Sequence, residues 1–561
     1  METGAAGARS EAGVLVVGAG PSGLVTALEL ARHGVRARVV DRRAGPAPAE
    51  QSRATIVHAR TLEVLDRFGL ADEALASGVP ITRVEVRERR RPTAHLPLAG
   101  GGVEGRTRFP CALSVAQSET ERILTAALAA RGVPVEWGRP VENVAPAGDG
   151  VEVRLGGGET LRVRWVVAAD GAGSTTRRCL GIGFIGGTYP QRGLLADVTF
   201  AADPPPPRLR LTLTRGGFVG VLPISPGRYR LFGAVPPGLA PGGAGGQVSH
   251  DPYQRLDAQE LRRWFDGYFE ATGTLDEVIW ASLFRFHSRI ADRFAAGGVF
   301  LVGDAAHVHN PAGGQGLNLG VGDAANLGWK LALVERGEAP PGLLDSYEAE
   351  RRPVARAITR NTDRGFRVET TANPVAMWLR GHVAMRLISV ASRWSAVRRT
   401  VFRTLSQTWI GYRGSPAVAA GRGRGPLRPG DRAPHAPLAA PGGGLLDLLR
   451  PGGFLLLAFE GTRPAPAGRR PDAAALGAAL AGRYTAGVPV RVIPRAEAAA
   501  HAAYGARRAR LVLLRPDGHV AWAGAWPAAG PPRRLTACLD RLLTARAGAP
   551  GKFRKSGKSG T

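Results

Sequence analysis

Cysteine is scarce in this chain of 561 residues. Its three cysteines, Cys111, Cys179 and Cys538, are scattered, and no two of them form a CxxC pair. Disulfide frameworks and zinc sites need several cysteines at short, regular spacing, so the sequence argues against both. His307 and His309 stand two residues apart. No carboxylate or third ligand is spaced with them, and we therefore expect no metal site.

Lysine is also scarce, although the chain is strongly basic. It has 74 lysines and arginines against 46 acidic residues and a net charge of +28, yet only four of the basic residues are lysines. The arginines form no single basic block and accompany no nucleic-acid recognition motif. With the abundant alanine, glycine and proline they indicate the codon bias of a GC-rich genome, and we expect no nucleic-acid partner. A field this positive can still attract anionic cofactors.

Long hydrophobic runs are absent as well. No stretch of 18 apolar residues occurs, so the sequence predicts neither a membrane span nor a membrane partner. The first apolar run, Val14 to Val17, is short and ends in a glycine turn, unlike a signal peptide. We expect a soluble, cytoplasmic protein.

What the sequence does have is a dinucleotide-binding turn. GAGPSG fits GxGxxG, follows the apolar strand VLVV and opens a helix, and Asp41 ends the next predicted strand. Gly18 permits the tight turn, Gly20 lets a pyrophosphate approach the backbone, and Gly23 lets helix and strand pack closely. The helix N-terminus attracts phosphates. The motif predicts an ADP-containing dinucleotide. Its candidate binding residues are Gly18, Gly20, Pro21, Ser22, Gly23, Asp41 and Arg42.

Two further turns favour FAD over NAD. One predicted strand ends in AADG, and another ends in LVGDAAH and leads into a glycine-rich helix start at 309–330. NAD needs no second turn of this kind, whereas the ribityl chain of FAD can bond Asp304. Backbone N–H groups at the helix start would bond a flavin carbonyl and favour negative charge on the ring. We interpret the glycines there as clearing space for a flat ring. The candidate residues of this half are Asp170, Gly303, Asp304, Gly314, Gly316, Leu317 and Asn318.

Five strings together resemble one family. GAGPSG, SRATIVHARTLEVLDRFG, QSETERIL, AADGAGSTTRR and GDAAHVHNPAGGQGLNLGVGDAANLGWKLA resemble the flavoprotein aromatic hydroxylases of the p-hydroxybenzoate hydroxylase type, the group A FAD monooxygenases. The branch they most resemble acts on aromatic polyketides and phenolic antibiotics. The resemblance implies that Arg53 lies near the flavin and that Gln117 contacts the cofactor. It also implies that the Val144 backbone touches the adenosine and that Pro311 stands beside the flavin ring. The family often has two prolines where this chain has Asn310 and Pro311.

The C-terminal part carries a further resemblance. That branch often ends in a thioredoxin-like domain that opens with RPGDRAP and contains LVLLRPDGHVAW, and both strings occur here. Without CxxC such a domain has no redox dithiol. We expect an α/β protein with a Rossmann-like FAD-binding domain, an antiparallel-sheet substrate domain and a thioredoxin-like domain. The expected segments are 12–184 (FAD-binding, first part), 185–285 (substrate sheet), 286–412 (FAD-binding return and helices), 427–548 (thioredoxin-like) and 549–561 (disordered tail).

The resemblance implies an NAD(P)H-consuming monooxygenase. Such an enzyme inserts one oxygen atom from O₂ into a phenolic or polycyclic aromatic substrate through a flavin C4a-hydroperoxide. No second GxGxxG occurs between a predicted strand and a predicted helix, which agrees with NADPH or NADH as a transient co-substrate. Baeyer–Villiger oxygenation, antibiotic inactivation by the same chemistry, and a non-catalytic drug- or pigment-binding flavoprotein stay open. Dimers occur in the family, but nothing in the sequence fixes a homodimer.

The alternating apolar pattern of residues 185–285 predicts the wall of an apolar substrate site. The sequence identifies no catalytic base, although His287, Tyr189 and Arg215 are candidates to activate a phenol. The candidate wall residues are Phe218, Val219, Leu222, Phe232, Phe284 and Phe286.

Overall fold

The structure is a computed structural model that divides into two compact units. The first comprises residues 1–31, 36–325 and 351–409, and the second residues 32–35, 326–350 and 410–561. No helix among the described residues is long and apolar enough to cross a membrane. The described residues are 13–48, 55–88, 91–97, 106–202, 208–236, 238–239, 254–271, 273–420, 427–439, 443–463, 472–528 and 530–547.

A mostly parallel sheet forms the centre of the first unit. In spatial order it consists of β19 (Ala295–Ala296), β20 (Val299–Leu301), β12 (Trp165–Ala168), β1 (Val14–Val17), β2 (Ala37–Val40) and β8 (Val135–Glu136). All four residues of β1 are buried, as expected where both faces of a parallel sheet are covered. The carboxyl ends of β1, β2, β12 and β20 lie at one edge, which is where ligands bind in sheets of this kind.

Short helices and two small sheets accompany this central sheet. The small sheets have the orders β11 (Thr160–Val163), β10 (Gly150–Leu155), β9 (Val141–Ala147) and β3 (Ile56–Val57), β7 (Ala112–Ser114), β4 (Val79–Ile81). The helices up to residue 179 are α1 (Pro21–Arg32), α2 (Ala59–Arg67), α3 (Ala71–Ala76), α4 (Gln117–Ala129) and α5 (Thr175–Cys179).

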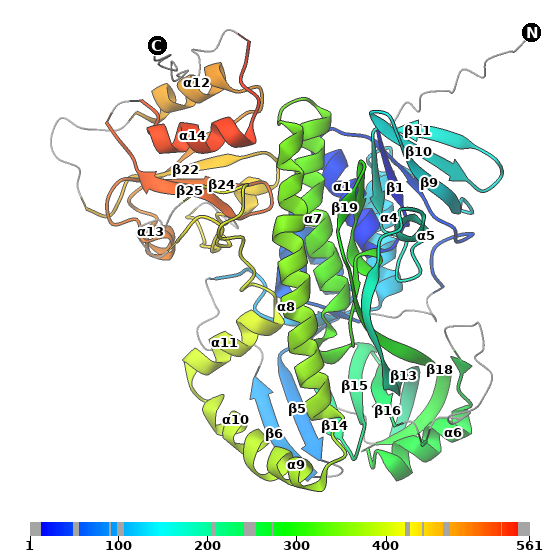
Figure 1. The fold of residues 1–561 in the computed structure, drawn as a ribbon. Helices are drawn as coiled ribbons and strands as arrows, with labels where there is room; N and C mark the ends of the chain where they lie inside the picture. Colours follow the sequence, from blue (N-terminus) through cyan, green and yellow to red (C-terminus); the bar gives the residue numbers. More distant parts are fainter. Residues whose placement is uncertain are drawn as a thin grey trace, which may run out of the picture. The chain divides into compact units, whose positions relative to one another are not determined.

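A nine-stranded sheet is the second large element of the first unit (Figure 1). Its main path runs β17 (Gln254–Arg255), β18 (Thr274–Ala291), β13 (Phe184–Ala202), β16 (Arg228–Val235), β15 (Phe218–Ser225), β14 (Leu209–Leu213), β5 (Arg83–Glu88) and β6 (Arg91–Pro97), and β21 (His307–Val308) pairs with β18. The predicted antiparallel strands of 185–285 are present. The sheet also includes β5 and β6, which lie outside the predicted segment 185–285: β5 pairs in parallel with β14.

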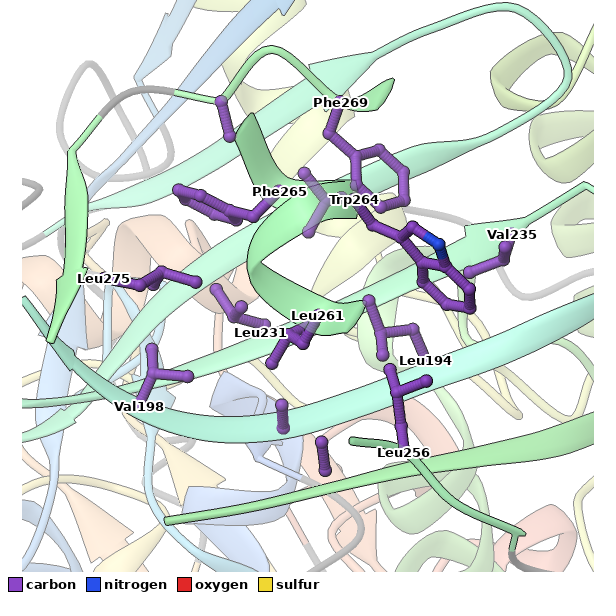
Figure 2. Packing of buried hydrophobic residues seen from close by; sticks show 14 of the residues in the cluster. Leu194, Val198, Leu231, Val235, Leu256, Leu261, Trp264, Phe265, Phe269 and Leu275 are labelled. Atoms are coloured by element: carbon purple, nitrogen blue, oxygen red, sulfur yellow. The ribbon is translucent and has the colours of Figure 1, made fainter. Parts of the chain in front are cut away.

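One face of this sheet packs against α6 (Ala258–Arg263) and the π-helical turn that follows it. Figure 2 shows Trp264, Phe265 and Phe269 of this segment among leucines and valines of the sheet strands. Phe265 and Phe269 are fully buried. Burying a large apolar side chain stabilises a fold by roughly 1.5–3 kcal/mol, so this segment anchors the strands that carry the cavity described below.

Two long helices, parts of which belong to the second unit, and three short ones follow in the chain. They are α7 (Gly316–Glu335), α8 (Asp345–Glu369), α9 (Pro374–Leu379), α10 (Met385–Ala391) and α11 (Ser395–Leu405). Figure 1 shows α9 and α10 beside β5 and β6.

The second unit contains a four-stranded sheet in the order β23 (Val490–Ile493), β22 (Leu455–Phe459), β24 (Arg510–Leu514) and β25 (Val520–Ala525). β22 and β23 are parallel, and the other pairs are antiparallel. Its helices are α12 (Ala473–Arg483), α13 (Ala498–Tyr504) and α14 (Arg533–Leu542).

A buried charge cluster lies in the second unit. Glu350 accepts bonds from Lys330 Nζ at 2.8 Å and from Arg515 Nη1 at 2.5 Å. Arg515 also pairs with Asp517. All four side chains are at most 2 % exposed, so the charges are compensated by one another rather than by water.

Candidate active site

A cavity of about 1280 Å³ lies in the first unit. It is lined by the turn after β1, the ends of β2 and β12, the segment 302–317, and residues of β13, β15, β16 and β18. The predicted cofactor residues and the substrate sheet therefore border one space.

The three glycines of the dinucleotide turn have different roles. A Cβ on Gly18 would lie 2.3 Å from the carbonyl oxygen of Ala169, and its φ is +104°. A Cβ on Gly23 would lie 1.9 Å from the carbonyl oxygen of Gly18. Both glycines are required by the packing of the protein itself. Gly20 borders the cavity, and a Cβ there would meet nothing within 4 Å, so this space is left for a ligand.

Asp41 lies at the end of β2 and is 7 % exposed. Its Oδ2 accepts from the backbone N–H of Ala19 at 2.7 Å, and its Oδ1 accepts from that of Arg43 at 2.8 Å. The Arg43 guanidinium bridges Asp41 to Glu121, to which Gln117 also donates at 2.8 Å. Arg42 is among the cofactor residues predicted from the sequence, whereas Arg43 is not. Both line the cavity, and the signal available was the pair of arginines directly after Asp41.

Asp170 borders the cavity with a spare acceptor. Its Oδ2 accepts from the backbone N–H of Thr176 at 3.0 Å, whereas Oδ1 is buried without a partner in the described part of the chain. A buried acceptor without a donor is costly, and a hydroxyl or amine of a bound dinucleotide would satisfy it. Asp304 also borders the cavity, from the 3₁₀ turn Gly303–Ala305. With the open space at Gly20, these groups fit FAD.

The sequence predicts that the glycines around the start of α7 clear space for a flat ring. In the structure, only some of them do so. A Cβ on Gly320 would lie 2.3 Å from Ser22 Oγ, and one on Gly303 would lie 2.4 Å from the same atom. A Cβ on Gly314 would lie 2.8 Å from Ile56. These three are required by neighbouring side chains. Gly316 borders the cavity, and its nearest neighbour would be His309 at 3.9 Å, so it keeps the proposed role.

Asn318 fixes the start of α7 through its side chain. Its Oδ1 accepts from the backbone N–H of His58 and from Thr61 Oγ1, both at 2.7 Å, and its Nδ2 donates to the carbonyls of Ile56 and Gly314, both at 2.8 Å. The first N–H groups of a helix have no partner within it. That the backbone N–H group of Asn318 bonds a flavin carbonyl stays a prediction.

The structure brings thirteen of the predicted cofactor residues to the cavity. Of the others, Gly23, Gly303, Asn318 and Val144 do not line the cavity. Val144 is buried in β9, so the cavity does not support the expected contact of its backbone with the adenosine. Arg53 lies outside the described residues. The thirteen are Gly18, Gly20, Pro21, Ser22, Asp41, Arg42, Gln117, Asp170, Asp304, Pro311, Gly314, Gly316 and Leu317.

His307 has a structural role. Its Nε2 bonds Asp323 Oδ2 at 2.6 Å, and Arg351 Nε donates to Asp323 Oδ1 at 2.6 Å. All three side chains are at most 1 % exposed. No group of three metal-ligating side chains occurs within the described ranges.

Of the candidate bases, only His287 lines the cavity. Burial, with Arg289 and Arg285 nearby, lowers the pKa of His287, which favours the neutral ring. Burial and Asp363, to which the hydroxyl donates, raise the pKa of Tyr189 to about 12. Arg215 is exposed and outside the lining. The catalytic base therefore stays unassigned.

Four of the six predicted wall residues line the cavity: Leu222, Phe232, Phe284 and Phe286. Phe218 and Val219 are at most 1 % exposed, do not line it, and belong to the core instead. An apolar wall thus faces the space that the cofactor residues also border.

Two sequence families match the chain. The FAD binding domain family matches residues 11–362, and the aromatic-ring hydroxylase C-terminal family matches residues 427–546. With the site described above, these matches define the chain as a flavin-dependent oxidoreductase. More narrowly, it belongs to the FAD-dependent aromatic-ring monooxygenases, for which NAD(P)H is the typical electron donor.

Relatives and solved structures agree with this family. The chain is 36% identical over 543 residues to 6-methylpretetramide 4-monooxygenase of Streptomyces rimosus, covering 91% of this chain and 90% of that protein. It is 34% identical over 524 residues to rifampicin monooxygenase of Rhodococcus hoagii, covering 91% and 95%. The ternary complex of aklavinone-11 hydroxylase with FAD and aklavinone superposes with a TM-score of 0.73 at 29% identity, covering 95% of this chain and 99% of that one.

Proposed function

We propose that this monooxygenase hydroxylates a phenolic, polycyclic aromatic compound of the polyketide type. The observation that carries the proposal is the shared cavity: aromatic side chains of β16 and β18 and the predicted flavin residues border the same space. The relatives named for pretetramide and aklavinone support a substrate of several fused rings.

Bound FAD supplies the chemistry that activates O₂. The protein must hold the cofactor, place the substrate ring and exclude water. Asp170 Oδ1 and the free space at Gly20 bind cofactor groups, and the N–H groups at the start of α7 favour negative charge beside them. Phe232, Phe284 and Phe286 exclude water from the substrate end of the cavity.

The test is NADPH consumption by the FAD-loaded protein with hydrogen peroxide monitored in parallel. Polycyclic phenols, quinones and naphthoquinone-type antibiotics are added one at a time. A true substrate accelerates NADPH loss without matching peroxide release, and mass spectrometry of the product shows one added oxygen atom. A flavin-free protein whose negligible basal rate no compound changes would instead be a binding protein.

A second candidate is oxygenation of a finished antibiotic. The relative named rifampicin monooxygenase supports it. The same assay distinguishes the two, because an antibiotic substrate would be consumed and lose antibacterial activity. A lactone or ester product, identified by NMR, would mark Baeyer–Villiger oxygenation.

We also propose the domain segments 12–184, 185–285, 286–412 and 427–548, the last with a thioredoxin-like fold. The β23-β22-β24-β25 order, with β22 and β23 parallel, supports that fold. Burial raises the pKa of the Cys538 thiol to about 11, so the domain carries no reactive thiolate there. Cys538 should resist thiol reagents in the native protein and react after unfolding. The predicted tail 549–561 lies outside the described residues.

A further inference from the structure

Two arginines stand directly opposite each other on the cavity wall. Arg192 of β13 and Arg285 of β18 are partners in the antiparallel register, and both line the cavity. Opposite residues of an antiparallel pair project to the same face, and like charges there repel. His287, two residues further along β18, lies on the same face and also lines the cavity.

Nothing within the described ranges neutralises this pair. Neither guanidinium group makes a hydrogen bond or an ion pair with another described residue; the Arg192 side chain is partly buried and that of Arg285 is exposed. The residues of the nine-stranded sheet that line the cavity include no acid. The four acids in the cavity lining all lie outside this sheet: Asp41, Glu121, Asp170 and Asp304.

From this geometry we infer that Arg192 and Arg285 together bind an anionic group of a small molecule in the cavity. The inference rests on the proposed function for the use of this cavity. Guanidinium groups donate paired hydrogen bonds to carboxylates and phosphates. Phe284 and Phe286 flank Arg285 in the chain and also line the cavity, but they project to the other face of the strands, where Phe284 is the partner of Gly193. The fitting ligand therefore carries a carboxylate or a phosphate: it is either an aromatic acid or the phosphates of the nicotinamide dinucleotide.

Binding to the FAD-loaded protein, measured without turnover by flavin fluorescence, tests this inference. The titrants are 3-hydroxy-2-naphthoate, its methyl ester and NADP⁺. The variants are Arg192→Gln and Arg285→Gln, with Arg285→Lys to retain the charge. Arg360→Gln, which removes an exposed arginine of α8 outside the cavity, is the matched control.

Each Gln variant should raise the Kd of one anion about tenfold, as expected for loss of a charged hydrogen bond. The Kd of the methyl ester should change less than about twofold. Arg285→Lys should retain part of the affinity for the anion. A change confined to the naphthoate assigns the pair to a substrate acid, and a change confined to NADP⁺ assigns it to the dinucleotide. The inference is overturned if neither anion binds wild-type protein more tightly than both Gln variants.

These titrations are independent of catalysis. Failure of every compound in the NADPH assay would overturn the proposed function while leaving an anion preference measurable. If a Gln variant does not retain FAD, the Lys variant at the same position replaces it. Each Lys variant should bind the anion more tightly than any Gln variant that retains FAD.

Discussion

At the scale of single residues, glycines with the same appearance in the sequence do different things. Gly20 faces free space beside the cavity, whereas Gly320 packs against Ser22 of α1. A sequence pattern shows that side chains are missing at both positions. It does not show whether a ligand or another part of the protein occupies the space.

This difference gives a first prediction. Gly20→Ala should leave the unfolding temperature of the apoprotein nearly unchanged but weaken FAD binding by about tenfold or more, because the methyl group occupies ligand space. Gly320→Ala is the comparison: overpacking against Ser22 should cost about 1–3 kcal/mol of stability. Thermal unfolding of the apoprotein and FAD fluorescence titration measure the two effects. Equal destabilisation by both variants would contradict the assignment.

A second prediction concerns Asp323. It accepts hydrogen bonds from His307, Arg351 and the backbone N–H of Gly303. Burial alone would raise the pKa of Asp323, but Arg351 and His307 together outweigh it and hold the pKa below its usual value. Asp323→Asn leaves Arg351 buried without its counter-charge, which should cost about 3–5 kcal/mol. Urea unfolding checks this. A loss below about 1 kcal/mol would show that Arg351 finds another partner.

At the scale of elements, the central strands of the parallel sheet and the glycine turns that follow them were predictable from local patterns. The strand VLVV, its turn and α1 are continuous in sequence, so spacing alone places them. The assignment of β5 and β6 to the large sheet was not predictable. β5 pairs with β14, more than a hundred residues later, and only packing joins them. The link from Arg43 to Glu121 is equally non-local.

The buried charge cluster around Glu350 gives a third prediction, which concerns the dependence of stability on pH. Burial alone would raise the pKa of Glu350, but Arg515 and Lys330 outweigh it and lower the pKa to about 2. The unfolded value is near the ordinary one of about 4.3. The folded pKa is therefore depressed, so this stabilisation is complete above the unfolded pKa and is lost as the pH falls towards 2.

Unfolding of the second unit, followed by hydrogen exchange of β22 and β24 between pH 5.5 and 3, should show this loss. Glu350→Gln is the control. It should destabilise the unit at pH 7 and flatten the dependence on pH, because residue 350 no longer titrates. An unchanged slope in this variant would assign the acid sensitivity to other carboxylates.

At the scale of the whole molecule, every residue that lines the cavity belongs to the first unit. A ligand that binds only the native state stabilises what it binds. As a fourth prediction, FAD should slow hydrogen exchange most in peptides of the first unit around residues 13–48 and 302–325. Peptides around 510–525 in the second unit should change little. Equal protection of both units would show that the cofactor stabilises the chain as one cooperative body.

The chain's shortage of lysine has a practical consequence once the structure is known. Lys330 is completely buried against Glu350 and Asn326, and the three remaining lysine side chains are Lys552, Lys555 and Lys558. The amine of Lys330 is therefore shielded from amine-reactive dyes in the folded protein. Because only three other lysines exist, peptide mapping can distinguish a label on Lys330 from labels on them, and a label on Lys330 reports that the structure around Glu350 has opened.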